Sequence, residues 1–215
     1  KKKEDNFSNR LITHFDPLNP VSEAYRGIRT NITYSNPDQE TKTIMVTSPG
    51  PSEGKTTTAI NLAIAFSQFN KKTLIVDTDL RKPIIHKIFE SEKEPGIADY
   101  LVQKNNDFKF EHIIRETKIE NLFFIPSGSS LPNPSELLGS KQMEEFINIV
   151  KTKFDLVIFD TPPVIAVTDS RVIVQSLDTM ILVINSGKTD IHHLQRAHSL
   201  LESVNAPLIG CILNA

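Results

Sequence analysis

The sequence predicts an α/β fold with a mostly parallel central sheet flanked by helices on both faces. Short apolar, β-branched runs recur along the chain and are nearly continuous in apolar character, which is typical of strands buried on both faces. Segments with helical periodicity lie between these runs. Such alternation, with crossovers of this length, is typical of an open parallel sheet that binds its ligand at the carboxyl ends of the strands.

The elements follow in order along the chain. Strands are expected at residues 43–47, 73–77, 122–125, 156–160, 179–184 and 208–213. Apolar residues at helical spacing predict helices at residues 56–68, 141–151 and 190–204. A further helical stretch at residues 20–36 precedes the first strand, and the charged segment 82–120 is expected to form helices and loops over the sheet edge.

The length and the net charge of the chain limit the possible domain organisations and functions. The 215 residues are expected to form one domain, 1–215, in which residues 1–20 are a mobile or extended N-terminal segment and residues 21–36 a separate helix. Lys plus Arg number 24 and Asp plus Glu 26, so the net charge is −2. This balance argues against a protein dominated by nucleic-acid binding.

Cysteine content and hydropathy indicate the compartment. Cys211 is the single cysteine, which excludes a disulfide framework and fits a reducing environment. The longest apolar runs fall far short of the ~20 residues that span a bilayer. No apolar stretch typical of a secretion signal follows the N-terminal lysines. We therefore expect a soluble, cytoplasmic protein.

A phosphate-binding loop is expected directly after the first strand. The sequence TSPGPSEGKTT joins that strand to a helix, and the core Gly54–Lys55–Thr56 sits at the helix start. Amide N–H groups at a helix start favour anions, and a Lys ammonium adds a charge for the β- and γ-phosphates. Pro49 stands where the usual pattern has its first glycine. The candidate nucleotide ligands are Gly50, Ser52, Glu53, Gly54, Lys55, Thr56 and Thr57.

Two later strands end in aspartates. LIVDTD places Asp77 and Asp79 at the end of one strand, and LVIFD places Asp160 at the end of another. Carboxylates at this edge can assist a Mg²⁺ nucleotide, because Mg²⁺ takes few protein ligands and prefers hard oxygens. We expect Thr56 to hold Mg²⁺ directly, with Asp160 acting through water and Asp79 assisting.

Catalysis is assigned to Lys55, Asp77, Asp79 and Asp160. Asp77 is the candidate base for an incoming hydroxyl, although Asp77 and Asp79 could exchange roles. Asn214, just past the last strand, is a candidate for reading adenine. Simpler readings exist for each: a Gly-Lys-Thr can begin any helix, and strand-end aspartates or a terminal asparagine often serve as helix caps or turn residues.

The motifs TSPGPSEGKT, LIVDTDLRKP and LVIFDTPP resemble the Walker A, A′ and B motifs of bacterial tyrosine kinases of the stand-alone cytoplasmic Gram-positive type. Residues 22–31, 126–138 and 209–214 agree as well, so the resemblance runs from about residue 11 to the end. It implies a P-loop NTPase fold related to septum-positioning and partition (MinD/ParA-like) ATPases. It also implies an ATP- and Mg²⁺-dependent protein-tyrosine autokinase that regulates capsular or exopolysaccharide synthesis and export.

The resemblance also implies partners. Glu23, Arg26 and Arg29 match an E-x-x-R-x-x-R element that assembles the family's subunits into a ring, here expected to be an octamer, with phosphoryl transfer in trans. From the residues alone, Glu23 and Arg26 could equally form an exposed ion pair within a helix. A membrane-bound activator with a cytoplasmic tail would recruit the kinase to the inner face of the membrane, and tyrosine-bearing proteins would be substrates.

The sequence departs from the family in two ways. Ser52 stands where the family usually has glycine, and the family's C-terminal tyrosine cluster is not within these 215 residues, whose only tyrosines are Tyr25, Tyr34 and Tyr100. Two other functions stay open at this point: an ATPase switch of the MinD/ParA type and a non-catalytic, nucleotide-dependent assembly regulator. Gly50 argues against the switch, whose loop carries a lysine at that position.

Overall fold

The computed structural model describes residues 10–35, 40–103 and 108–214. It contains a seven-stranded sheet in the order β3-β4-β2-β5-β1-β6-β7. Six strands run parallel and match the predicted ones closely: β1 Thr43–Thr47, β2 Thr73–Asp77, β4 Leu122–Ile125, β5 Leu156–Asp160, β6 Thr179–Asn185 and β7 Leu208–Asn214. The predicted parallel sheet is therefore confirmed.

One short strand was not predicted. β3 (Arg115–Glu116) pairs antiparallel with β4 at the sheet edge. Its two residues are charged and only partly buried, so they carry none of the apolar pattern that marks the other strands. The described residues of the segment 82–120 otherwise form loops and the short helices α4 (Ile85–Ile88), α5 (Ile97–Val102) and η2 (Phe110–His112), as expected.

The four long predicted helices are present: α2 Pro20–Tyr34, α3 Lys55–Ser67, α7 Lys141–Lys153 and α9 Ile191–Glu202. Asn19, Ser140 and Asp190 cap the first, third and fourth of these through their side chains. The shorter helices α6 (Pro134–Leu138), α8 (Asp169–Ile173) and η3 (Val174–Ser176) follow the carboxyl ends of strands and were not predicted, because they are too short to show a helical period.

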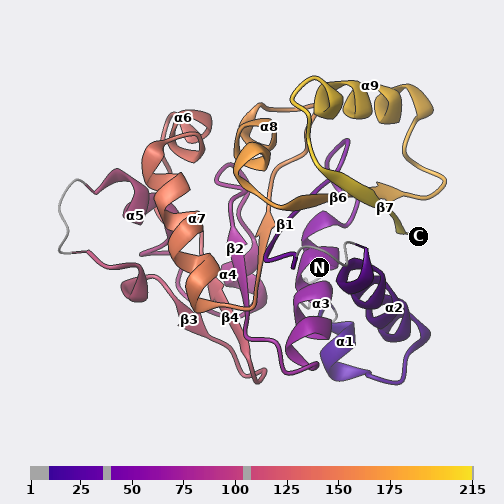
Figure 1. The fold of residues 1–215 in the computed structure, drawn as a ribbon, viewed down its shortest axis with the longest axis horizontal. Helices are drawn as coiled ribbons and strands as arrows, with labels where there is room; N and C mark the ends of the chain where they lie inside the picture. The colour runs from indigo at the N-terminus through magenta and orange to yellow at the C-terminus, as the bar shows by residue number, and fades with distance from the viewer. Residues whose placement is uncertain (1–9, 36–39, 104–107, 215) are drawn as a thin grey trace, which may run out of the picture.

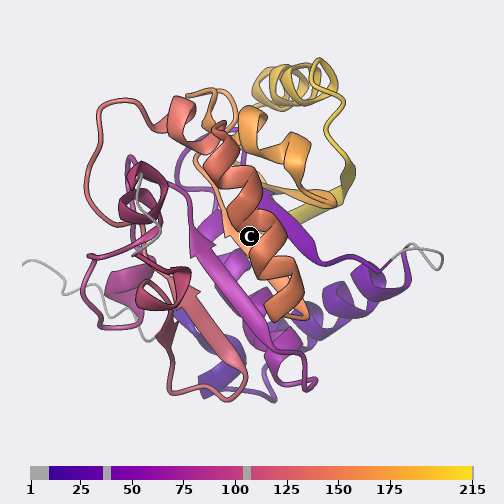
Figure 2. The same cartoon turned by 60° about the vertical axis from the view of Figure 1, so that its left-hand side comes forward.

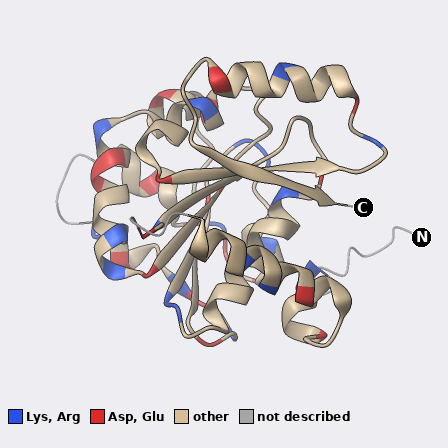
Figure 3. Cartoon of the chain, turned by 45° about the vertical axis from the view of Figure 1, so that its right-hand side comes forward, with Lys and Arg blue, Asp and Glu red and all other residues tan. Residues whose placement is uncertain are grey.

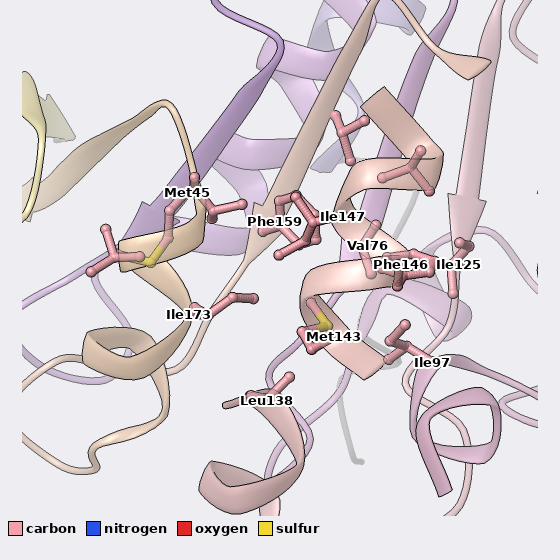
Figure 4. Packing of buried hydrophobic residues seen from close by; sticks show 14 of the residues in the cluster. Met45, Val76, Ile97, Ile125, Leu138, Met143, Phe146, Ile147, Phe159 and Ile173 are labelled. Atoms are coloured by element: carbon pink, nitrogen blue, oxygen red, sulfur yellow. The ribbon is translucent and has the colours of Figure 1, made fainter. Parts of the chain in front are cut away.

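Helices cover both faces of the sheet (Figures 1 and 2), and the sheet separates two hydrophobic cores. Alternate residues of one strand enter opposite cores: Met45 of β1 packs with α7 and α8, whereas Ile44 and Val46 pack with α3. Figure 4 shows the first core, in which Phe146 of α7 and Phe159 of β5 are fully buried. This two-layer burial explains why the strands read as continuous apolar runs.

The expectation of a mobile or extended segment over residues 1–20 is wrong for its described part. Residues 1–9 lie outside the described residues, but α1 (Ile12–Phe15) is a helical turn packed on α3. Asn61 in the middle of α3 explains this packing. Its Nδ2 donates to the carbonyl oxygen of Arg10 at 2.6 Å, and its Oδ1 accepts from the N–H of Thr13 at 3.0 Å.

Charges are mixed over the helices and loops, with blue and red segments interspersed in Figure 3. Within the described ranges, no helix combines the length and the apolar character that crossing a membrane requires. The parallel strands bring their carboxyl ends to one edge of the sheet, where Asp77 of β2 lies in register with Asp160 of β5. This edge is where the candidate site is built.

Candidate active site

The loop between β1 and α3 has the geometry of a phosphate cradle. Gly54 occupies the N-cap of α3 with a left-handed φ of 89°, and its carbonyl oxygen accepts from the N–H of Thr58. A Cβ at this position would lie 2.2 Å from Nδ2 of Asn214, so glycine is needed both for the backbone angle and for space. The free N–H groups of the first helical turn point to the end of the sheet where anions are favoured.

The Glu53 side chain shapes this loop. Its Oε1 accepts a hydrogen bond from the N–H of Gly50, and its Oε2 accepts from the N–H of Asn185 and the hydroxyl of Thr189. The carboxylate is therefore used within the protein, and only the main chain of Glu53 is available to a nucleotide. Sequence reasoning had placed Glu53 among the nucleotide ligands and had not found this role, because Asn185 and Thr189 lie more than 130 residues away.

Ser52 takes the backbone conformation that glycine favours. Its φ is 62°, in the left-handed region that L-residues with a Cβ adopt at a cost. The departure from the family's glycine therefore leaves the loop in a left-handed conformation, with strain at one residue.

Lys55 lies between two carboxylates at the base of the loop. Its Nζ is 2.9 Å from Oδ2 of Asp79 and 3.4 Å from Oδ1 of Asp160. The hydroxyl of Thr56 donates to the other oxygen of Asp160 at 2.6 Å. Burial alone would lower the pKa of Lys55, but Asp160 and Asp79 outweigh it and raise that pKa above its usual value. For Asp160, burial dominates and raises the pKa of the carboxyl.

Asp77 is fully buried beside this cluster. Its Oδ2 accepts from the N–H groups of Ile84 and Ile85 at the start of α4, so the simpler reading of a helix cap is correct for that oxygen. Its Oδ1 has no hydrogen-bond partner among the described residues. Burial first, and the neighbouring Asp160 second, raise the pKa of Asp77 to about 8. A buried carboxyl with one oxygen unpartnered and a raised pKa is typical of a functional site.

The loop after β2 is held by side chains that the sequence did not reveal. Oδ1 of Asp79 accepts from the N–H of Lys82 at 3.1 Å, which closes a turn. Arg81 donates twice to the fully buried Asp169 of α8, at 3.0 and 3.1 Å. Ser135 of α6 donates to the same carboxylate. Arg81 and Ser135 lie within segments that resemble the family, but the sequence does not indicate that the fold brings Asp169 to them.

A cavity of about 560 Å³ opens over the loop. It is lined by Arg10, Pro51, Ser52, Gly54, Lys55, Thr56, Thr57, Asp79, Lys82, Ile84 and Pro163. Of the other predicted site residues, Asp77 and Asp160 are buried beside this lining. Gly50 lies in the loop, where its N–H donates to Glu53, and the side chain of Asn214 donates to the carbonyl oxygen of Glu53. Six of the predicted residues thus share one cavity, and the remainder support it.

The donor set fits Mg²⁺ bound together with phosphates. A Thr hydroxyl and two carboxylates meet at Thr56, Asp160 and Asp79, and all are hard oxygens. The Lys55 ammonium lies among these oxygens, which shows that the position attracts a cation. Among the described residues, no group of three or more His, Cys, Asp or Glu side chains could hold a metal by itself.

The predicted oligomerisation residues lie on α2. Glu23 pairs with Arg26 at 2.6 Å, and Arg26 also donates to the carbonyl oxygen of Pro17. Arg29 donates to the carbonyl oxygen of Ala65 near the end of α3, and its guanidinium lies 4.4 Å from the ring centre of Phe69. These contacts fix the helix on the domain.

Comparison with protein-family models matches residues 41–208 to a family described as "AAA domain". The "Tyrosine-protein kinase YwqD" of Bacillus subtilis is 39% identical over 214 residues, covering 100% of this chain and 89% of that protein. The "Putative tyrosine-protein kinase CapB" of Staphylococcus aureus is 34% identical over 204 residues, covering 95% of this chain and 88% of that protein.

Solved structures agree with these relatives. The chimerical protein CapA2B2 superposes with a TM-score of 0.91 at 38% identity, covering 96% of this chain and 89% of the other. The kinase domain of the Escherichia coli tyrosine kinase ETK gives 0.90 at 31% identity, covering 95% and 79%. The septum site-determining protein MinD from Pyrococcus horikoshii, solved with Mg-ADP, gives 0.65 at 25% identity, covering 80% and 70%. The predicted P-loop NTPase fold is therefore confirmed.

Proposed function

The chain belongs to the bacterial tyrosine kinases, within the AAA domain family, and from this premise we propose that it transfers the γ-phosphoryl group of ATP to protein tyrosines in the regulation of capsular or exopolysaccharide synthesis. The observation that carries the proposal is the convergence of Lys55, Thr56 and three aspartates beneath one phosphate loop. Relatives named tyrosine-protein kinases and the high structural similarity to the ETK kinase domain support it.

The phosphate loop is proposed to bind the triphosphate through its N–H groups and through Lys55. Lys55 is paired with Asp79 and Asp160, so it can turn to the phosphates when a divalent cation takes over those carboxylates. Mg²⁺ would be held by Thr56 with Asp160 and Asp79, and it would neutralise charge on the β- and γ-phosphates. The chain's own contribution is positioning and charge, which is most of what phosphoryl transfer needs.

In the transfer step, the acceptor tyrosine oxygen forms a bond to the γ-phosphorus while the bond from that phosphorus to the β–γ bridging oxygen breaks. ADP leaves with the bridging oxygen, and the phenolic proton passes to a carboxylate. We assign that carboxylate to Asp77, since its Oδ1 has no other partner, with Asp79 at the cavity wall as the alternative. A tyrosine hydroxyl has a pKa near 10, so a nearby base assists its attack.

The partners are proposed from the family. The subunits are proposed to assemble through Glu23, Arg26 and Arg29 into a ring of eight. Such a ring would bring an acceptor tyrosine of one subunit to the site of another. The exposed carboxylate of Glu23 is available for such a contact. A membrane-bound activator with a cytoplasmic tail is proposed to recruit the kinase to the inner face of the membrane. No nucleic acid is expected as a partner.

Incubation with γ-labelled ATP, Mg²⁺ and a tyrosine-containing peptide tests the function. Label on tyrosine supports the kinase, whereas release of free phosphate alone would indicate an ATPase switch, and neither product would indicate an assembly regulator. Lys55→Met is expected to abolish the label while circular dichroism still shows a folded chain. Lys118→Met, at an exposed lysine outside the cavity, is the matched control and should retain full transfer.

A further inference from the structure

We propose that Lys82 selects acceptor tyrosines flanked by acidic residues, by placing a fixed positive charge at the acceptor side of the cavity. This inference rests on the proposed kinase function and names the substrate class of the same site. Lys82 lies in the loop between β2 and α4, and this loop and the phosphate loop both line the cavity.

The main chain around Lys82 is held at several points. Its own N–H donates to Asp79, the preceding Arg81 is anchored on buried Asp169, and the following Pro83 restricts the backbone. Beyond it, the N–H groups of Ile84 and Ile85 are bound by Asp77. The constrained backbone keeps the main chain of Lys82 at one point of the cavity wall, from which its flexible side chain can bring the positive charge to an acceptor.

The side chains of Arg81 and Lys82 make different contacts. Arg81 forms an ion pair with Asp169 and does not line the cavity. Lys82 is exposed, lines the cavity, and has no ion pair among the described residues. Ile84 and Pro163 are partly buried in the same wall. These two apolar residues suit the ring of an entering tyrosine, and Lys82 then faces the residues beside it.

The charges of the cavity favour an anionic partner. Its lining contains Arg10, Lys55 and Lys82 against a single carboxylate, Asp79, which is paired with Lys55. The phosphates already have Lys55 and the N–H groups of the phosphate loop. The charge of Lys82 is therefore left for the acceptor, and a carboxylate next to the tyrosine complements it, whereas a lysine there would be repelled.

Steady-state transfer to three synthetic peptides tests this inference. Each peptide has one central tyrosine, flanked by glutamates, alanines or lysines, and kcat/KM is measured at low ionic strength. The unaltered chain should prefer the acidic over the basic peptide at least threefold, and the preference should shrink as salt is added. Lys82→Glu should reverse the order of the two charged peptides. Lys87→Glu, an equal charge change on the exposed face of α4 outside the cavity, should keep the original order.

The outcomes separate the two levels of the proposal. Equal use of acidic and basic peptides by the unaltered chain, or an unchanged order in Lys82→Glu, would overturn the role of Lys82 while leaving the kinase intact. A raised KM for ATP in Lys82→Met, with all peptides affected alike, would show that Lys82 binds the nucleotide and would also overturn it. Lys82→Met removes the positive charge without adding a negative one. If Lys82→Glu does not fold, Lys82→Met is tested instead, and it should lose the preference for the acidic peptide. Absence of transfer to every peptide would refute the kinase function itself.

Discussion

Glu53 accepts a hydrogen bond from the N–H of Gly50 at 2.8 Å, so one residue of the phosphate loop fixes the backbone of another. The second oxygen of Glu53 reaches Asn185 and Thr189 at the end of β6. Glu53 is only 7% exposed, and its carboxylate is satisfied from both sides. The hydrogen bonds of Glu53 therefore connect the phosphate loop to the neighbouring strand and preorganise it. This preorganisation lowers the entropic cost of ordering the loop around phosphates.

We predict that Glu53→Ala weakens nucleotide binding at least tenfold, because Gly50, Asn185 and Thr189 lose their acceptor and the loop gains freedom. Titration of a fluorescent ADP analogue measures the affinity, and circular dichroism checks the fold. Glu120→Ala, at an exposed glutamate without a hydrogen bond in the structure, should bind ADP normally. Normal binding by Glu53→Ala would show that the loop keeps its conformation without the hydrogen bonds of Glu53.

Ser52→Gly is expected to raise the free energy of unfolding by about 0.5–1 kcal/mol, since glycine adopts the left-handed φ of 62° without a Cβ clash. The gain is partly offset by the larger entropy of glycine in the unfolded chain. Urea unfolding measures the difference. Ser52→Ala keeps the Cβ and should show no such gain, and an equal gain in both variants would contradict strain as the cause.

The fold could be predicted from sequence wherever burial is continuous. The parallel strands carry apolar side chains into two cores, and their aspartate ends, Asp77 and Asp160, mark the ligand edge. α1 could not be predicted in this way, because its packing depends on hydrogen bonds from Asn61, 48 or more residues away. Local patterns contain no information on such contacts.

The residues of the candidate site likewise fall into those that the sequence predicts and those that it does not. Lys55, Thr56 and the three aspartates could be predicted, because loop and strand ends place them near each other in any sheet of this topology. The supporting contacts could not, since Glu53 and Asp169 each act on residues more than 80 positions away. In the sequence, an acidic residue that is buried and hydrogen-bonded to a distant partner cannot be distinguished from an acidic residue on the surface.

Asp178 gives stability a defined pH dependence. Burial alone would raise its pKa, but hydrogen bonds from Lys151 and from the N–H groups of Lys42 and Thr43 outweigh burial and lower it. A lowered folded-state pKa adds stability above the unfolded pKa of about 3.9, and this contribution is lost as the pH falls through the folded value. Asp178→Asn should cost about 1–2 kcal/mol at pH 7.

Thermal unfolding from pH 7 to pH 3 measures this contribution. The gap between the unaltered chain and Asp178→Asn should narrow below about pH 4, where the carboxyl takes up a proton in the unfolded chain while the native carboxyl, with its lowered pKa, stays ionised to lower pH. Asp155→Asn alters another carboxylate that binds a main-chain N–H, that of Lys72, and should show a smaller loss because the residue is more exposed. A gap that stays constant with pH would contradict a charge-dependent contribution from Asp178.

Asp77→Asn is predicted to lower phosphoryl transfer at least about 100-fold at pH 8, where a pKa of about 8 leaves about half of the Asp77 carboxyls ionised and able to accept a proton. The same change should stabilise the free chain at pH 8. With its pKa raised to about 8, the native carboxyl holds a proton that the unfolded chain releases near pH 4. Stability therefore falls as the pH rises from 4 to 8, and asparagine removes this slope. Peptide labelling and urea unfolding measure the two effects, and full transfer by Asp77→Asn would move the base to Asp79.

The ion pair between Arg81 and Asp169 is expected to stabilise the loop that contains Asp79. Asp169 is fully buried, and Arg81→Ala leaves its charge without the guanidinium, so a loss of about 2–3 kcal/mol is expected. Asp169→Ala also frees Ser135 of α6. Because the two residues share one interaction, the double variant should lose less than the sum of the single losses, by about 1 kcal/mol or more. Urea unfolding of the four proteins gives this coupling, and strictly additive losses would show that the pair contributes no stability as a pair.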